Sequence, residues 1–230
     1  MYDMRWIIAS HGVAVLLLSI ILVDSRKMSS YKSLDSSVYI FMVCLAIIQC
    51  FVETFSFIVD GAHFPGSYTL CLIVDSLLYI NNTMFAFIWS LYVDLKLQIK
   101  TDNMKKRISL TVIPSALIIV LSLVNLFTPV FYQIDRVTNV YQRTSLYWLP
   151  NLVVGFYFFY TVLFAPKRYT QSTRYIFFPI IGFLIPITIG VILEYAFYGL
   201  TLIWLCAAIS LTSIYISLQN QISYTDLLSG

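Results

Sequence analysis

Charged residues are scarce in this sequence. Asp, Glu, Lys and Arg make up 11% of its 230 residues, against about 25% in soluble domains. Apolar residues make up 60%, the mean hydropathy is +0.84 and the net charge is only +3. No basic arm or patch follows the pattern of a nucleic-acid-binding protein. These shortages exclude an ordinary soluble domain, and they predict a membrane protein without a nucleic-acid partner.

Motifs for metal binding and catalysis are also missing. Neither His-Glu-x-x-His nor Gly-x-Ser-x-Gly occurs, and there is no His-rich run that could bind haem or a metal. The four cysteines fall within apolar stretches, at spacings that indicate neither metal ligands nor a disulfide: Cys44, Cys50, Cys71 and Cys206. We therefore expect no metal, no cofactor and no active site in residues 1–230.

Seven apolar stretches are present, each near the roughly 20 residues that a helix needs to cross a bilayer. They are Trp6–Val23, Ser37–Val59, Tyr68–Val93, Ile108–Tyr132, Tyr147–Ala165, Tyr175–Phe197 and Leu200–Leu218. Charged or turn-forming segments separate them. The sequence therefore predicts an all-α membrane protein, with a seven-transmembrane helix bundle over residues 1–218.

The placement of lysine and arginine predicts how the chain crosses the membrane. Of the 14 such residues, three, five and three fall in alternate connections: Arg26, Lys27 and Lys32, then Lys96, Lys100, Lys105, Lys106 and Arg107, then Lys167, Arg168 and Arg174. Arg5, Arg136 and Arg143 fall on the other side. Because cytoplasmic loops hold the excess of positive charge, we expect the N-terminus outside, the C-terminus in the cytoplasm, and a location in the plasma or inner membrane.

The last residues form a polar segment after the seventh stretch. Residues 218–222 have the composition of an exposed helix, and the Asp-Leu-Leu-Ser-Gly of residues 226–230 is typical of a turn. That pentapeptide resembles the Asp-x-Leu-Thr-Gly turn that opens the diguanylate cyclase (GGDEF) domain, with Ser229 where threonine is usual. The chain thus resembles the seven-transmembrane sensor region of a bacterial diguanylate cyclase, and an ordinary tail is the alternative.

The resemblance implies an output domain that begins within residues 219–230 and makes cyclic di-GMP in the parent protein. It also implies a homodimer, paired through the output domain and the seventh helix, because a cyclase of this family joins two GTP molecules across two active sites. The chain itself would be the input domain and not the enzyme.

Three acidic residues lie inside the predicted spans: Glu53, Asp75 and Glu194. A charge within the bilayer costs several kcal/mol, so such residues usually face the bundle interior. Polar residues at helical spacing form two faces, made of Gln49, Glu53, Ser56 and Asp60 on the second span and of Asp75, Tyr79 and Asn82 on the third. These faces predict a shared cavity in the outer half of the bundle, which His11 and Trp204 could line.

No lysine or arginine lies within a predicted span to neutralise these acids. Three interpretations stay open: hydrogen bonds between helices, a ligand pocket, and a proton or ion relay. A pocket would take its positive charge from the outer loop or from the ligand, and its acidity favours a cationic or zwitterionic molecule. The candidate ligand-binding residues are Glu53, Asp75, Tyr79, Asn82, Arg136, Arg143, Glu194, His11 and Trp204.

We expect the chain to be a transmembrane receptor that senses an extracellular small ligand and regulates the output domain. The alternative is a seven-helix small-solute transporter. Such carriers often consist of repeated halves around a site at the membrane midplane, whereas spans one to three and five to seven show no convincing similarity.

Prolines in the fourth and sixth spans, at Pro114, Pro129, Pro179 and Pro186, predict kinks.

Overall fold

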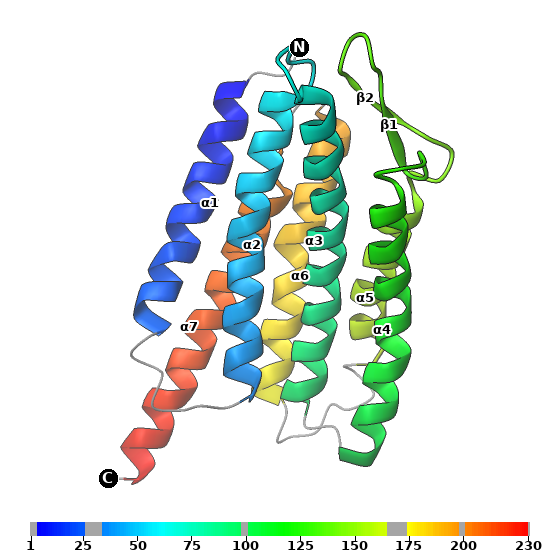
Figure 1. Ribbon diagram of the computed structural model, residues 1–230. Helices are drawn as coiled ribbons and strands as arrows, with labels where there is room; N and C mark the ends of the chain where they lie inside the picture. The colour runs from blue at the N-terminus through cyan, green and yellow to red at the C-terminus, as the bar shows by residue number, and fades with distance from the viewer. Residues whose placement is uncertain (1–3, 26–33, 98–100, 165–173, 198–200, 230) are drawn as a thin grey trace. The chain divides into compact units, whose positions relative to one another are not determined.

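The computed structural model describes residues 4–25, 34–97, 101–164, 174–197 and 201–229 (Figure 1). Within them the chain forms seven α-helices and a two-stranded sheet. The helices are α1 (Met4–Ser25), α2 (Leu34–Val59), α3 (Ser67–Lys96), α4 (Thr101–Val124), α5 (Leu149–Phe164), α6 (Arg174–Ala196) and α7 (Ile203–Ser229), and the strands are β1 (Tyr132–Ile134) and β2 (Tyr141–Arg143). The predicted all-α class is confirmed, apart from this small hairpin.

The fourth helix ends earlier than the sequence predicts. We expected it to continue to Tyr132 with Pro129 inside it, but α4 ends at Val124 and Tyr132 belongs to β1. The reason lies in Asn125, whose side-chain oxygen accepts the backbone N–H groups of residues 130, 131 and 132. These bonds hold the chain in a tight turn after Val124, and the apolar residues that follow pack as strand and loop.

The seventh helix ends later than the sequence predicts. The expected helix at residues 218–222 is confirmed, because α7 continues to Ser229. The expected turn over residues 226–230 is wrong as far as Ser229, and Gly230 lies outside the described residues. Leucine is a strong helix former, so Leu227 and Leu228 extend the preceding helix locally.

Three of the described helices, α1, α2 and α3, are long and apolar enough to cross a membrane. The apolar runs in the other four are shorter: Thr111–Val124, Leu149–Leu163, Ile181–Glu194 and Ile203–Gln219. These helices are compatible with a membrane protein. Several of the basic residues used to predict orientation lie outside the described part of the chain: Arg26, Lys27, Lys32, Lys100, Lys167 and Arg168.

The chain folds as two units, which we describe separately. Unit 1 comprises residues 1–50 and 164–230, and unit 2 comprises residues 51–163. In unit 1, α7 packs against both α1 and α6. Gly190 makes the second contact possible, because a Cβ atom there would lie 3.0 Å from the Sγ of Cys206 and 3.3 Å from the Cα of Ile203. A small residue at a helix interface lets two backbones approach closely.

In unit 2, α3 packs against α4 and against β1. Residues from α2 through α5 and from the hairpin share one apolar core, made of Val59, Cys71, Ala86, Ile118, Phe131, Tyr132, Ile134, Val153 and Tyr157. Three of these residues, at 131, 132 and 134, come from the hairpin and the residue before it. The hairpin is therefore part of the unit's interior and is not a loose surface loop.

The Tyr157 side chain of α5 enters the backbone hydrogen bonds of α4. In a regular helix the Ser115 N–H would donate to the Thr111 carbonyl. Here Ser115 N donates to the Tyr157 hydroxyl at 3.1 Å, and that hydroxyl donates to the Thr111 oxygen. Pro114 precedes this point inside α4 and has no N–H of its own. The predicted interruption at Pro114 thus occurs where a neighbouring hydroxyl satisfies the adjacent backbone groups.

Candidate functional site

The hairpin is held in one register by its alternating side chains. Tyr132 pairs with Arg143, Gln133 with Gln142, and Ile134 with Tyr141. Tyr132 and Ile134 are buried, whereas Gln133 is exposed and donates to Gln142 at 3.0 Å. A shift by one residue would exchange the buried and exposed faces, so burial fixes this pairing.

Asn125 anchors the first strand. Its side chain is 2% exposed. Its Oδ1 accepts the N–H groups of Val130, Phe131 and Tyr132 at 2.8, 2.7 and 3.3 Å, and its Nδ2 donates to the Tyr132 oxygen at 3.1 Å. One amide therefore satisfies four backbone groups, which fixes where the hairpin leaves α4.

Asp135 and Asn139 shape the hairpin turn. The Asp135 Oδ1 accepts the N–H groups of Val137 and Thr138, each at 2.8 Å. These bonds favour the ionised carboxylate and hold the pKa of Asp135 below its ordinary value. Asn139 adopts a φ of 54°, a conformation that asparagine tolerates better than most residues. Its carbonyl accepts from Gly61 N, and its Nδ2 donates to the Ala62 oxygen at 2.8 Å, so the turn is fixed to the connection between α2 and α3.

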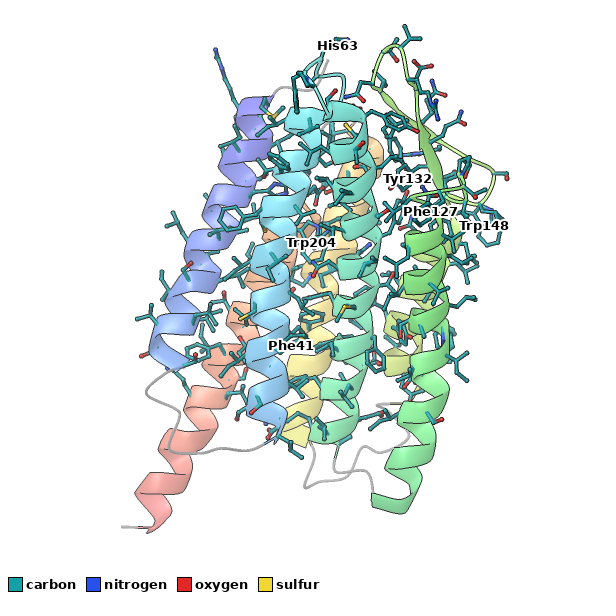
Figure 2. All side chains as sticks on the ribbon, in the orientation of Figure 1. Phe41, His63, Phe127, Tyr132, Trp148 and Trp204 are labelled. Carbon is teal, nitrogen blue, oxygen red and sulfur yellow. The ribbon has the colours of Figure 1, made fainter. Side chains whose placement is uncertain are left out.

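Three tyrosines form the interface between the hairpin and α3. The rings of Tyr79 and Tyr132 stack at 5.7 Å, and those of Tyr132 and Tyr141 at 5.4 Å. The hydroxyls of Tyr79 and Tyr141 lie 2.7 Å apart, and the Tyr132 hydroxyl donates to the Leu72 oxygen at 2.6 Å. Figure 2 labels Tyr132 among the side chains of this region. Burial raises the pKa of Tyr132 and of Tyr141. Both therefore remain neutral hydroxyls at physiological pH.

Two carboxylates of unit 2 lie beside this tyrosine cluster. Asp75 is 5% exposed, and its Oδ1 accepts the Ser56 hydroxyl at 2.6 Å. Asp60 lies one turn after Ser56, and its Oδ1 accepts the N–H of Tyr141 at 2.8 Å. The two polar faces predicted on α2 and α3 thus meet through Ser56 and Asp75, and β2 joins them through Asp60. Among the described residues, the charged group that acts on Asp75 is the like-charged Asp60.

Each of the two predicted arginines lies over a tyrosine ring. The guanidinium of Arg136 lies 5.5 Å from the centre of the Tyr68 ring, and that of Arg143 lies 5.1 Å from the centre of the Tyr147 ring. Both arginines are exposed. Glu53 lies on α2 and Asn82 on α3, and both are partly buried. Whether any of these residues contacts a ligand stays a prediction.

The other three predicted residues belong to unit 1. His11 is 3% exposed and Trp204 is 6% exposed. Glu194 is partly buried, and its Oε1 accepts the N–H groups of Leu202 and Ile203 at 2.5 and 2.8 Å. A carboxylate at this position satisfies free N–H groups at the start of α7 and interacts favourably with the helix dipole. Glu194 therefore has a structural role that the sequence did not predict.

Sequence reasoning missed four residues that build the site: Asn125, Tyr132, Asn139 and Tyr141. Two signals were present. The alternation in Tyr-Gln-Ile and Tyr-Gln-Arg is typical of half-buried strands, and the Asp-Arg-Val-Thr-Asn between them is typical of a turn. The predicted fourth helix includes Tyr132, the first residue of β1, because this residue continues an apolar run.

The arrangement offers hydrogen-bond acceptors and neutral hydroxyls, and no ready metal ligand set. In the described part of the chain, no group of three or more His, Cys, Asp or Glu residues is placed to hold a metal ion. Comparison of the chain with models of known families, with curated proteins and with solved structures gives no match.

Proposed function

We propose that the chain is a seven-span membrane receptor domain with its N-terminus outside and its C-terminus in the cytoplasm. Three long apolar helices and four further helices with apolar runs support this arrangement. The asymmetric distribution of lysine and arginine supports the orientation. On this proposal, the hairpin and the tyrosine cluster lie at the outer end of unit 2.

The single observation that carries the proposal is the buried carboxylate of Asp75. It receives one hydrogen bond, from Ser56, and among the described residues it has a second carboxylate and no cation as its charged neighbour. A carboxyl group in such surroundings is either protonated, and then serves as a hydrogen-bonding group between helices, or complemented by a cation from outside. The receptor proposal takes the second alternative. A small extracellular ligand with a positively charged group, cationic or zwitterionic, fits this requirement.

The hairpin provides a route by which such a ligand would act on the bundle. Tyr141 bonds Asp60 through its N–H and Tyr79 through its hydroxyl. A ligand that binds Asp75 and displaces either contact changes how the hairpin holds α2 and α3. Ligands shift a conformational equilibrium only through such differences in affinity between two states.

The proposed output of the receptor is a cytoplasmic domain beyond α7. This part of the proposal rests on the sequence of residues 226–230, which resembles the opening of a diguanylate cyclase domain, and not on their conformation, which is helical as far as Ser229. The continuation of α7 to Ser229 supports a rigid connection to that domain. We propose that the parent protein is a homodimer that makes cyclic di-GMP, and that ligand binding changes the pairing of the two copies of α7.

The proposal is tested by substituting the carboxylates. We expect Asp75→Asn or Glu53→Gln to alter the cyclic di-GMP output of the parent protein without preventing folding, because each removes one negative charge and little volume. Asp35→Asn is the matched control, since Asp35 lies in the first turn of α2, the helix that carries Glu53, and not beside the hairpin. Equal output from all three variants and the wild type would remove the carboxylates from the mechanism.

Two further measurements distinguish the proposal from its alternative. Reporter fusions after Gly230 should locate this end of the chain in the cytoplasm, and an external location would reject the receptor. Purified chain in proteoliposomes should gain thermal stability from a small panel of amines and amino acids without transporting them. Transport of such a compound would favour the carrier instead.

A further inference from the structure

The foot of the hairpin presents apolar side chains and a cation together. Phe127 is 89% exposed and follows the end of α4, while Trp148 is 46% exposed and precedes α5 (Figure 2). Leu146 and Tyr147 are also exposed. Arg143 ends β2, and its guanidinium stacks over the Tyr147 ring at 5.1 Å. We call Phe127, Arg143, Leu146, Tyr147 and Trp148 the foot surface.

The local structure holds this surface rigidly. Thr144 donates to the Val130 oxygen through its Oγ1 at 2.5 Å, and its N–H donates to the Phe131 oxygen at 3.1 Å. Tyr147 N donates to the Thr144 oxygen at 3.4 Å, and Leu149 N donates to the Leu146 oxygen at 3.1 Å. The large apolar side chains are therefore exposed in a fixed backbone and not in a loose loop, and fixed exposed apolar groups of this kind mark an interaction surface.

The chemistry of the foot surface fits the boundary between lipid tails and headgroups. Tryptophan and tyrosine are enriched at that depth, since one part of each ring is apolar and another part is polar. The surface lies where the apolar runs of α4 and α5 end, at Val124 and Leu149. A guanidinium stacked on a ring still has outward N–H donors, and its planar fork matches phosphate oxygens.

We propose that the foot surface binds the headgroup of an anionic phospholipid, with the Arg143 guanidinium on the phosphate and the side chains of Phe127 and Trp148 beside the acyl chains. The positive charge of Arg143 favours an anionic headgroup as the occupant of this surface. Among the described residues no carboxylate forms an ion pair with Arg143, and its guanidinium lies over the Tyr147 ring. The inference rests on the membrane insertion of the proposed function but not on its ligand.

The test measures which lipids stay bound to the full chain. Wild-type protein and variants are placed in nanodiscs that contain equal phosphatidylcholine and phosphatidylglycerol, and retained lipid is counted by native mass spectrometry. We expect the wild type to enrich phosphatidylglycerol, and Arg143→Gln to lower the enrichment about fivefold, as one surface arginine contributes. Arg143→Lys should retain part of the preference, because it keeps the charge and loses the planar fork.

Arg136→Gln is the matched control. Arg136 is also exposed and also stacks on a tyrosine, Tyr68, but it lies in the hairpin turn and not at the foot. We expect this variant to keep most of the enrichment. An equal loss in both variants would indicate diffuse charge attraction and would overturn the proposed site.

Other occupants give different results. If millimolar inorganic phosphate raises the thermal stability of the wild type while phosphatidylglycerol is not enriched over phosphatidylcholine, the surface binds free phosphate and the lipid proposal is wrong. If wild type and Arg143→Gln retain the two lipids equally, the surface is not a headgroup site, and a protein partner becomes the explanation of its exposed aromatic residues. Neither result touches the proposed receptor, which fails only on the carboxylate variants or on the location of Gly230.

Discussion

Units 1 and 2 hold their helices together with different groups. In unit 1 the contact between α6 and α7 depends on the absence of a side chain at Gly190, and the start of α7 is satisfied by the Glu194 carboxylate. In unit 2 buried tyrosine and asparagine side chains reach across to backbone groups of other segments, as Asn125 and Tyr157 do. The contact between α6 and α7 in unit 1 thus relies on close approach of two backbones, beside directed bonds such as that from the Tyr39 hydroxyl to the Leu211 oxygen. In unit 2 such directed bonds fix the hairpin and the interruption of α4.

The difference indicates where a single substitution should have a specific effect on stability. Shape-packed helices tolerate many side chains of similar volume. A network of hydrogen bonds between particular donors and acceptors does not tolerate such substitutions, because a buried donor or acceptor without its partner costs free energy. We therefore expect polar substitutions to matter most in unit 2 and volume substitutions to matter most in unit 1, and the variants below test this contrast in order of expected effect.

Asn125→Ala should have the largest effect. The change leaves three backbone N–H groups and one carbonyl without their partner, and it should lower the free energy of unfolding by about 3 kcal/mol. Chemical unfolding in detergent micelles measures this loss, and amide hydrogen exchange at residues 130–132 should accelerate. Asn125→Asp is the control, since it keeps the acceptor for the three N–H groups and should cost less. A loss below that of the Asp variant would contradict the anchoring role.

Gly190→Ala tests the shape-packed contact of unit 1. The new methyl group would meet a cysteine side chain and the backbone of α7, so α6 and α7 must separate slightly. We expect a loss of about 2 kcal/mol in the free energy of unfolding. Gly182→Ala is the matched control on the same helix, because no atom lies within 4 Å of a Cβ atom there. It should be neutral or slightly stabilising, since alanine is the better helix former. Equal effects of the two variants would show that close approach does not matter.

Tyr215→Phe tests how much a directed hydrogen bond contributes to the stability of unit 1. The Tyr215 hydroxyl donates to Asp24 Oδ2 at 2.7 Å, and Gln219 Nε2 donates to the same carboxylate oxygen at 2.7 Å. Because Gln219 still bonds Asp24 in the variant, the loss should be about 1 kcal/mol. Thermal unfolding measures it, with Tyr147→Phe as an exposed control. A loss as large as that of Asn125→Ala would remove the contrast between the units.

The pH dependence of the hairpin turn should be the smallest effect. The folded pKa of Asp135 lies below its ordinary value, so its contribution to stability is present above about pH 4 and is lost as the pH falls through the folded pKa. Protection of the Val137 and Thr138 amides should decrease in that acid range. Asp135→Asn should show no such dependence. Protection that is constant down to low pH in the wild type would mean that the turn does not need the carboxylate.

Much of the helical layout could be read from the sequence, because long apolar runs give a strong signal. All seven predicted stretches correspond to helices in the described residues, and the largest boundary errors are at α4 and α7. The two polar faces were also readable, because residues three and four apart share a side of a helix. Their meeting through Ser56 and Asp75 follows from helical spacing on each side together with the short connection between α2 and α3.

The hairpin and the residues to which it is hydrogen-bonded could not be predicted from the sequence in this way. Tyr132 lies 56 residues from Ser76, and Asn139 lies 77 residues from Ala62, yet each pair is joined by a hydrogen bond. Local patterns carry no information about such partners. For the same reason Glu194 could be placed within a helix but not identified as the group that satisfies the start of α7.

The sequence by itself determined which segments are apolar helices and which face of α2 and of α3 is polar. The tertiary structure alone decided that a two-stranded hairpin follows α4, that its tyrosines lie against α3, and that Asp60 accepts the N–H of Tyr141. The physical reason is that apolar periodicity is a property of neighbouring residues, whereas the partner of a buried polar group depends on which distant segments the packing brings within hydrogen-bond distance.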